Sequence, residues 1–302
     1  MGAAQARVNT ASTAEGAAVL RAAGAAEPDP AVRNPDWMAA RFVDWGPRLP
    51  ALVKVPGARR LVPRIVERLL PGAYPFETAR TRHMDDVLLA EVYGGVAQVV
   101  LLGAGYDSRP YRLAGRLRGA RVFEVDLPEL GAIKRAKVRR IVGEPPANVR
   151  YVEIDFTRDD LGERLAASGH DRDAATLYLW SGVAPYLPQE AVREVLGFVG
   201  SHGSPDTSIA FDYCFGEVVD GAEESYGSRE LLARVESIGE PLRSGIPRGE
   251  TAAFVGECGL RLESDLGPDD AVARHLTRSD GSLLGRPYGF GGLAHARVGA
   301  SA

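Results

Sequence analysis

Hydrophobic and polar positions follow different patterns on the two sides of residue 95. Before it, helical patterns are broken repeatedly by proline, and no segment has the pattern of a strand. After it, short apolar runs alternate with stretches that are typical of helices. The apolar runs are 99–102, 121–125, 149–154, 176–180 and 208–214, with further candidate strands at 259–264 and 292–298. This alternation predicts βαβ units, and therefore an α/β fold with a parallel sheet and helices on both faces.

The pattern also predicts a single domain with an N-terminal helical cap over residues 1–95 and a Rossmann-like core over residues 96–302. The first eight or so residues are expected to be a disordered tail. Ser12 and Glu15 have the spacing of a capping box that opens a short helix toward Gly24. A second helix is expected near the end of the cap, around residues 81–93.

Residues 215–249 are expected to be an active-site lid. The stretch is rich in glycine, proline and charged residues and holds one predicted helix at 228–239. It is too long to be a simple connection between two elements of a sheet, and such loops usually have a function.

A glycine-rich turn follows the first apolar run, in the order strand, turn, helix. Gly103 permits a tight turn and Gly105 a close approach of the backbone to a ligand, at the strand end where α/β sheets bind ligands. A dinucleotide site requires a third glycine, but Ser108 stands there. Asp107 would repel a pyrophosphate, whereas it would be favourable beside the ammonium group of a methionine. The charges therefore favour S-adenosylmethionine over NAD.

Acidic residues follow the next two predicted strands. Asp126, at the end of the second, is placed to accept hydrogen bonds from the hydroxyls of a ribose. The alternative is that Asp126 caps the following helix. Asp155 and Phe156 follow the third strand, where they could meet the amino group and the ring face of an adenine. Asp155 could equally cap the helix expected at 159–167.

Composition and charge exclude several other classes. The formal net charge of −4 and the isoelectric point near 5.8 argue against a nucleic-acid-binding protein. A basic cluster on one predicted helix is interpreted as a solvated surface; it consists of Lys134, Arg135, Lys137, Arg139 and Arg140. Cys214 and Cys258 have no metal-ligand spacing and cannot form a disulfide framework, which fits a reducing cytoplasm. No run of 18 apolar residues indicates a membrane span, and no feature indicates an oligomeric state.

Several sequence blocks resemble the leucine carboxyl methyltransferase family, in particular its bacterial branch of polyketide-biosynthesis O-methyltransferases, which act in secondary metabolism. The blocks are 79–86 (ARTRHMDD), 98–113 with its LGAGYDSRPYRL run, 123–128 (FEVDLP), 155–156 (DF) and 182–187 (GVAPYL). They follow the order of the family, and the resemblance covers nearly the whole chain.

The resemblance implies a class I methyltransferase sheet of seven strands, the last antiparallel, that binds S-adenosylmethionine. Arg80, or alternatively Arg82, would pair with the carboxylate of the methionine moiety, because a guanidinium suits a carboxylate. From the sequence alone, both arginines could equally pair with Asp85 or Asp86 on the surface of a helix. The remaining implied cofactor contacts are Gly103, Ala104, Gly105, Asp126, Leu127, Asp155, Phe156 and Ser181. Ser181 stands where many relatives have Glu, which leaves the acceptor open.

The acceptor is expected to be a small molecule with a carboxylate group. A carboxylate is ionised at neutral pH and needs no general base, whereas a phenol or another hydroxyl benefits from one. No histidine lies in a recognisable base motif; His83 and Tyr186 are the weak candidates for a catalytic role. Arg243 and Arg248 in the predicted lid could attract an anionic acceptor or be exposed loop charges.

The sequence leaves open two other functional classes. One is an NAD-dependent oxidoreductase, which Asp107 and the missing third glycine disfavour. The other is a non-catalytic relative that binds S-adenosylmethionine without turnover, which Ser181 leaves open.

Overall fold

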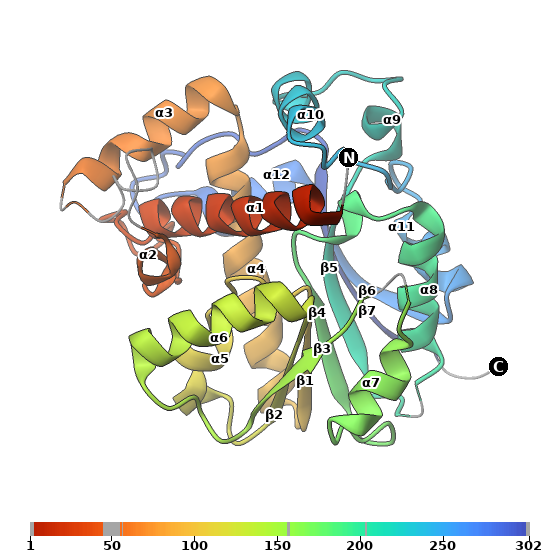
Figure 1. Cartoon of the computed structure of the whole chain (residues 1–302). Coiled ribbons are helices and arrows are strands. Elements are labelled where there is room, and N and C mark those ends of the chain that lie inside the picture. The colour runs from red at the N-terminus through yellow and green to blue at the C-terminus, as the bar shows by residue number, and fades with distance from the viewer. Residues whose placement is uncertain (1–2, 45–54, 56, 156–157, 203, 300–302) are drawn as a thin grey trace.

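A seven-stranded sheet in the order β3-β2-β1-β4-β5-β7-β6 forms the centre of the computed structural model, which describes residues 3–44, 55, 57–155, 158–202 and 204–299 (Figure 1). The strands are β1 (Gln98–Leu102), β2 (Arg121–Asp126), β3 (Val149–Glu153), β4 (Thr176–Trp180), β5 (Ser208–Cys214), β6 (Leu260–Leu266) and β7 (Gly291–Val298). Neighbours from β3 to β5 pair in parallel, and β7 pairs antiparallel with both β5 and β6. The predicted fold class is confirmed, and every predicted strand is present within two residues of its expected ends.

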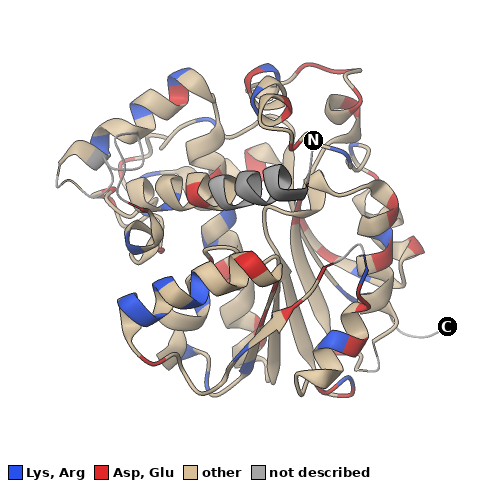
Figure 2. Ribbon diagram, in the orientation of Figure 1, with Lys and Arg blue, Asp and Glu red and all other residues tan. Residues whose placement is uncertain are grey.

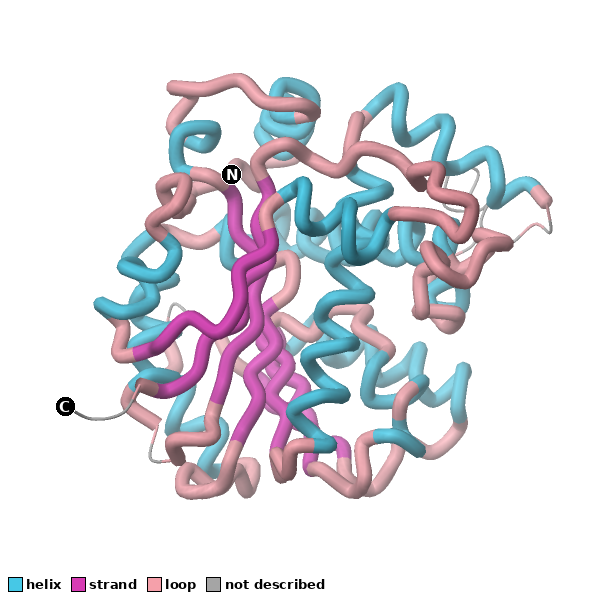
Figure 3. The backbone as a smooth tube through the Cα atoms, turned by 180° about the vertical axis from the view of Figure 1, so that it is seen from behind, coloured by secondary structure: helices cyan, strands magenta, loops and turns pink. Residues whose placement is uncertain are grey.

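Helices cover both faces of this sheet. They are α1 (Ala3–Gly24), α2 (Ala39–Phe42), α3 (Val62–Leu69), α4 (Ala73–Tyr93), α5 (Arg109–Arg112), α6 (Pro128–Val142), α7 (Leu161–Ala167), α8 (Gln189–Gly200), α9 (Gly216–Val219), α10 (Ser228–Ser237), α11 (Thr251–Glu257) and α12 (Pro268–Ala271). Alternate residues of each strand point to opposite faces, so Val99 packs in one apolar cluster with Leu88 of α4, and Val100 in the other with Leu196 of α8. Figure 3 shows the strands side by side in one twisted sheet between these helices.

The N-terminal cap is helical, and within its described residues it contains no strand. Two details differ from the prediction. The first helix begins at Ala3, so the disordered tail of eight residues was wrong, and the Ser12–Glu15 motif lies inside α1 instead of at its start. Glu15 instead accepts a hydrogen bond of 2.9 Å from the backbone N–H of Asp44, which ties α1 to the chain that follows α2. The helix expected near 81–93 extends back to Ala73 as α4.

Two lysines of the predicted basic cluster on α6 are buried, so the solvated-surface interpretation was wrong for them. The ammonium group of Lys134 lies 2.8 Å from the carboxylate of Glu124 on β2, and each of these side chains is 2% exposed. Lys137 lies 2.6 Å from the carboxylate of Asp44 and donates to the carbonyl of Phe42 at 2.8 Å. Both lysines share the buried face of α6 with Val138, whereas Arg135 is half-buried and Arg139 and Arg140 are exposed. Figure 2 shows the basic residues of this helix as blue segments of its ribbon.

No described helix is long and apolar enough to cross a membrane. The described residues also contain no group of three or more His, Cys, Asp or Glu side chains arranged to hold a metal ion. Cys214 and Cys258 are both free thiols.

Candidate active site

A cavity of about 1140 Å³ opens at the carboxyl ends of the parallel strands. Its floor comes from the segments that follow β1, β2, β3 and β4 and from the end of β5. Its walls and roof come from α1, α3, α4, the 215–249 insertion and the segment before β7. Single-ligand pockets span roughly 300–1,000 Å³, so this cavity has room for two small molecules at once.

The turn after β1 requires glycine for two reasons. Gly103 has a φ of +65°, in the left-handed region that favours glycine, and a Cβ there would lie 2.6 Å from Cγ2 of Val183. Gly105 has a φ of +40°, and its N–H donates to Asp126 at 2.6 Å. The second carboxylate oxygen of Asp126 accepts the N–H of Leu127 at 2.8 Å. The glycine turn and the end of β2 are therefore held together by one carboxylate, and burial raises its pKa.

Neither acidic residue caps the helix that follows it. The N-cap of α6 is Leu127, so Asp126 remains on the cavity wall. The N-cap of α7 is Asp160, whose side chain accepts the N–H of Glu163 at 2.8 Å. Asp155 lines the cavity, and Phe156 lies outside the described residues.

The structure distinguishes the two arginines of α4 that the sequence left open. Arg80 lines the cavity, with Nη1 2.7 Å from the carboxylate of Asp212 and Nη2 bonded to that of Glu77. Arg82 lies outside the cavity lining and donates to the carbonyl of Arg33 at 2.8 Å. Residues two apart on a helix project about 200° from each other, so only one of the pair can face the cavity.

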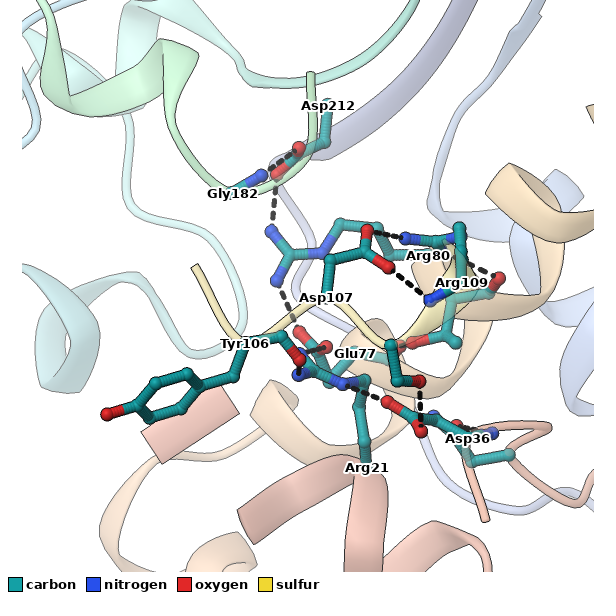
Figure 4. Close-up of polar contacts among 12 residues, drawn as sticks. Arg21, Asp36, Glu77, Arg80, Tyr106, Asp107, Arg109, Gly182 and Asp212 are labelled. Carbon is teal, nitrogen blue, oxygen red and sulfur yellow. Dashed lines mark hydrogen bonds and ion pairs between the residues drawn. The ribbon is translucent and has the colours of Figure 1, made fainter. Parts of the chain in front are cut away.

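Arg80 belongs to a chain of five alternating charges along the cavity wall (Figure 4). The chain runs from Asp212 to Arg80, Glu77, Arg21 and Asp36. Arg21, from α1, lies 3.2 Å from Glu77 and 2.9 Å from Asp36, and it also donates to the carbonyl of the residue after Gly105 at 2.9 Å. This hydrogen bond links the first helix of the cap to the glycine turn.

A second charged cluster involves Asp107. Its carboxylate pairs with Arg109, which lowers the pKa of Asp107 to about 2 despite burial, so the group stays ionised. Arg109 and Arg112 both bind Asp85, at 2.8 and 2.6 Å. The alternative in which Asp85 pairs with an arginine of α4 is therefore not found.

Asp212 is a site residue that the sequence analysis missed. It lies on β5, is 3% exposed, and accepts the N–H of Gly182 at 2.6 Å. The last pair of β4 and β5 is Trp180 with Phe211, so Asp212 and Ser181 each follow that pair by one residue, and Ser181 also lines the cavity. The only sequence signal was an acidic residue near the end of an otherwise apolar fifth strand.

The two candidate catalytic residues occupy different places. Tyr186 lines the cavity in a short turn after β4, and burial raises the pKa of its phenol. His83 faces away from the cavity, packed edge-on against His275 with 5.7 Å between ring centroids, and burial lowers its pKa to about 4. None of the five histidines, all of them in the described part of the chain, lines the cavity.

The 215–249 insertion forms one wall of the cavity. It contains two helices, α9 and α10, where the sequence predicted one. Apolar side chains of α10 and the segment after it face the cavity, and Thr13 of α1 donates to the carboxylate of Glu240 across its mouth. Arg243 lines the mouth, whereas Arg248 lies outside it, paired at 2.8 Å with Glu223.

Comparisons with known proteins agree with this architecture. Residues 14–200 match the leucine carboxyl methyltransferase family. A "Putative S-adenosyl-L-methionine-dependent methyltransferase" of Mycolicibacterium gilvum is 33% identical over 236 residues, which cover 76% of this chain and 71% of the relative. A protein of the same description from Mycolicibacterium paratuberculosis is 29% identical over 286 residues, 91% of this chain and 84% of the relative.

Two solved structures share the fold at 15% sequence identity. A putative methyltransferase from Thermobifida fusca has a TM-score of 0.58 and covers 81% of this chain and 89% of its own. A DUF574 family protein from Streptomyces avermitilis also has a TM-score of 0.58, and the match covers 86% of this chain and 97% of that protein. The chain belongs to the leucine carboxyl methyltransferase family and is an S-adenosylmethionine-dependent methyltransferase.

Proposed function

Given this family membership, we propose that the enzyme transfers the methyl group of S-adenosylmethionine to a carboxylate oxygen of a small organic acid. The observation that carries the choice of a carboxylate is the chemistry of the cavity lining, which offers no histidine among its described residues.

The proposed cofactor site runs along the strand ends. Gly103, Ala104 and Gly105 would hold the methionine moiety, with Arg80 toward its carboxylate; Asp126 and Leu127 would meet the ribose, Asp155 and Phe156 the adenine, and Ser181 would complete the site. The ion pair of Asp107 with Arg109 supports this assignment, because the pair has no net positive charge with which to attract the pyrophosphate of NAD. Bound S-adenosylmethionine supplies an electrophilic methyl carbon.

The rest of the cavity is suited to an acceptor with an apolar body. Leu70 and Phe76 line it from the cap, Val235 and Leu242 from the insertion, and Phe290 from the segment before β7. Packing of these side chains around the acceptor excludes water and orients its reacting oxygen, which is the main contribution a protein makes to a displacement reaction.

The hydroxyl and thiol groups beside this space are suited to orienting an anion, and they are poor bases. Burial raises the pKa of Tyr186 and Tyr288 and raises that of the Cys214 thiol to about 12, so all three keep their protons at neutral pH. A protonated phenol donates a hydrogen bond to a carboxylate. An acceptor that is ionised on its own, with a pKa near 4, needs nothing more from these groups.

Two arginines at the mouth support an anionic acceptor. Arg234 and Arg243 both line the cavity and are exposed, and in the described part of the chain neither guanidinium has an ion-pair or hydrogen-bond partner. Unpaired positive charge at a cavity mouth raises the local concentration of anions and their rate of entry.

Calorimetric titration with S-adenosylhomocysteine and with NADH tests the cofactor site. We expect the wild type to bind S-adenosylhomocysteine alone, and Asp126→Ala to weaken that binding at least tenfold. Asp160→Ala is the matched control, because it removes a carboxylate that caps α7 outside the cavity. Binding of NADH, or equal effects of the two substitutions, would refute the assignment.

Matched pairs of aryl acids and phenols then test the acceptor. We expect methylation of acids at a rate that is nearly constant from pH 6 to 8, because the acceptor is ionised throughout, whereas a phenol acceptor would give a rate that rises with pH. The Arg234→Ala/Arg243→Ala variant should raise KM for the acid about three- to tenfold at low salt, and Arg248→Ala should leave it unchanged. Turnover of phenols alone would contradict the proposal.

A further inference from the structure

The charged chain along the cavity wall carries one negative charge in excess. Its three carboxylates, on Asp212, Glu77 and Asp36, share the two guanidinium groups of Arg80 and Arg21. Ser108 donates to Asp36 at 2.5 Å, and Arg112 approaches it only to 3.8 Å. These five charged side chains therefore give this part of the cavity wall a net negative charge.

The neighbouring cluster is balanced. Asp107 and Asp85 face Arg109 and Arg112, two acids against two bases, each joined by at least one close ion pair. The second cluster therefore adds no net charge to the wall and does not cancel the excess charge of the first chain.

Asp212 is the least compensated member of the charged chain. Glu77 lies between two arginines, and Asp36 has an arginine and a serine hydroxyl. Among the described residues, the hydrogen-bond and ion-pair partners of Asp212 are Arg80, which it shares with Glu77, and the N–H of Gly182. It is 3% exposed and lines the cavity, so a ligand in the cavity is the group that can meet its remaining charge.

The strand order places Asp212 at the reactive end of the proposed cofactor. The residues assigned to adenine, ribose and methionine follow β3, β2 and β1 in turn, and these strands are neighbours in that order. The next two strands along the same line are β4 and β5. Asp212 lies on β5, one residue after the last pair of β4 and β5, and therefore beyond the contacts assigned to methionine after β1.

We propose that Asp212 provides the negative charge that favours the cationic sulfonium of S-adenosylmethionine over the neutral thioether of S-adenosylhomocysteine. This inference rests on the proposed cofactor site. A buried carboxylate interacts with a unit positive charge far more strongly than a solvated one, because the surroundings screen it less. Loss of the positive charge on methyl transfer removes that interaction, so Asp212 promotes exchange of product for fresh cofactor.

Calorimetry with three ligands tests the proposal without turnover. The ligands are S-adenosylmethionine, S-adenosylhomocysteine and sinefungin, an analogue with a charged amine in place of the methylsulfonium. We expect Asp212→Asn to raise Kd about tenfold for the two cationic ligands and less than about twofold for S-adenosylhomocysteine, since a tenfold change corresponds to the loss of one modest charge interaction. Asp36→Asn removes the same charge from the other end of the row of charged side chains. It should discriminate less between the cationic ligands and S-adenosylhomocysteine.

Each outcome supports or overturns the role proposed for Asp212. Equal losses for all three ligands would show that Asp212 only maintains the shape of the site, and unchanged affinities would show that it has no role; both overturn the proposal. If Asp212→Asn does not fold, the wild type decides, because sinefungin must then bind more tightly than S-adenosylhomocysteine. Failure of all three ligands to bind the wild type would instead overturn the cofactor site itself.

Discussion

Substitution of Gly103 by alanine should damage the turn after β1 through two separable costs. Alanine at a φ of +65° carries a conformational strain of about 1–2 kcal/mol. The new Cβ would also lie 2.6 Å from Cγ2 of Val183, an overlap that forces the turn or the β4 segment to move and costs about 1–3 kcal/mol. The sum is roughly 2–5 kcal/mol, shared between stability and ligand affinity.

Two further variants separate the strain from the overlap. Gly105 has a φ of +40°, but a Cβ there would meet nothing closer than Cβ of Ala14 at 3.6 Å, so Gly105→Ala measures strain alone. Val183→Ala in the Gly103→Ala background removes the overlapping methyl group and leaves the strain. Urea unfolding gives the stability of each variant, and titration with S-adenosylhomocysteine gives the affinity.

The expected result is a strong coupling between positions 103 and 183. Val183→Ala should cost the wild type about 1 kcal/mol but restore about 1–3 kcal/mol to Gly103→Ala. Additive effects of the two substitutions, or a Gly103→Ala variant as stable and as competent in binding as the wild type, would refute the close packing of the turn against the β4 segment.

Three other outcomes follow from the structure. Lys134→Met should destabilise the protein by about 3–5 kcal/mol in urea unfolding, because buried Glu124 loses its positively charged partner and keeps, among the described residues, only the hydroxyl of Tyr111 at 3.0 Å. Lys134→Met/Glu124→Leu should recover most of the loss, and full stability of the single variant would contradict a buried pair. Burial lowers the pKa of His83 and that of His170 from 6.5 to about 4. Between these two pH values, the unfolded chain therefore binds more protons than the native protein. Stability should be full above pH 6.5 and fall below it by up to about 1.4 kcal/mol per pH unit per histidine until about pH 4; a flat profile from pH 7 to 5 would contradict this. Arg82→Ala should leave the affinity for S-adenosylhomocysteine within about twofold, since its guanidinium binds carbonyl groups outside the cavity; a tenfold loss would place Arg82 at the cofactor.

The sheet could be predicted from the sequence because its signals are local. Parallel strands that are buried on both faces appear as continuous apolar runs, and β1, β4 and β5 are buried along their whole length. The glycine turn and Asp126 were found for the same reason, since their spacing within one βα unit carries the information.

The remaining site contacts could not be predicted because they join distant parts of the chain. Arg80 and Asp212 are 132 positions apart, and only the strand order brings β5 beside the turn that contains Gly182. The burial of Lys134 likewise depends on which face of α6 packs against β2. A basic helix has the same sequence pattern whether its lysines face solvent or a buried glutamate.

The fastening of α1 to the far side of the cavity has a consequence for the order of events during synthesis. Thr13 contacts Glu240 across 227 positions, and Arg21 reaches the backbone at Tyr106. The first helix leaves the ribosome early, yet its partners emerge only after most of the core has been made. Contacts of such long range are slow to form, because the intervening chain must be ordered before they can contribute. The cavity should therefore be among the last parts of the molecule to form, and α1 should remain accessible to chaperones until the insertion at 215–249 has been synthesised.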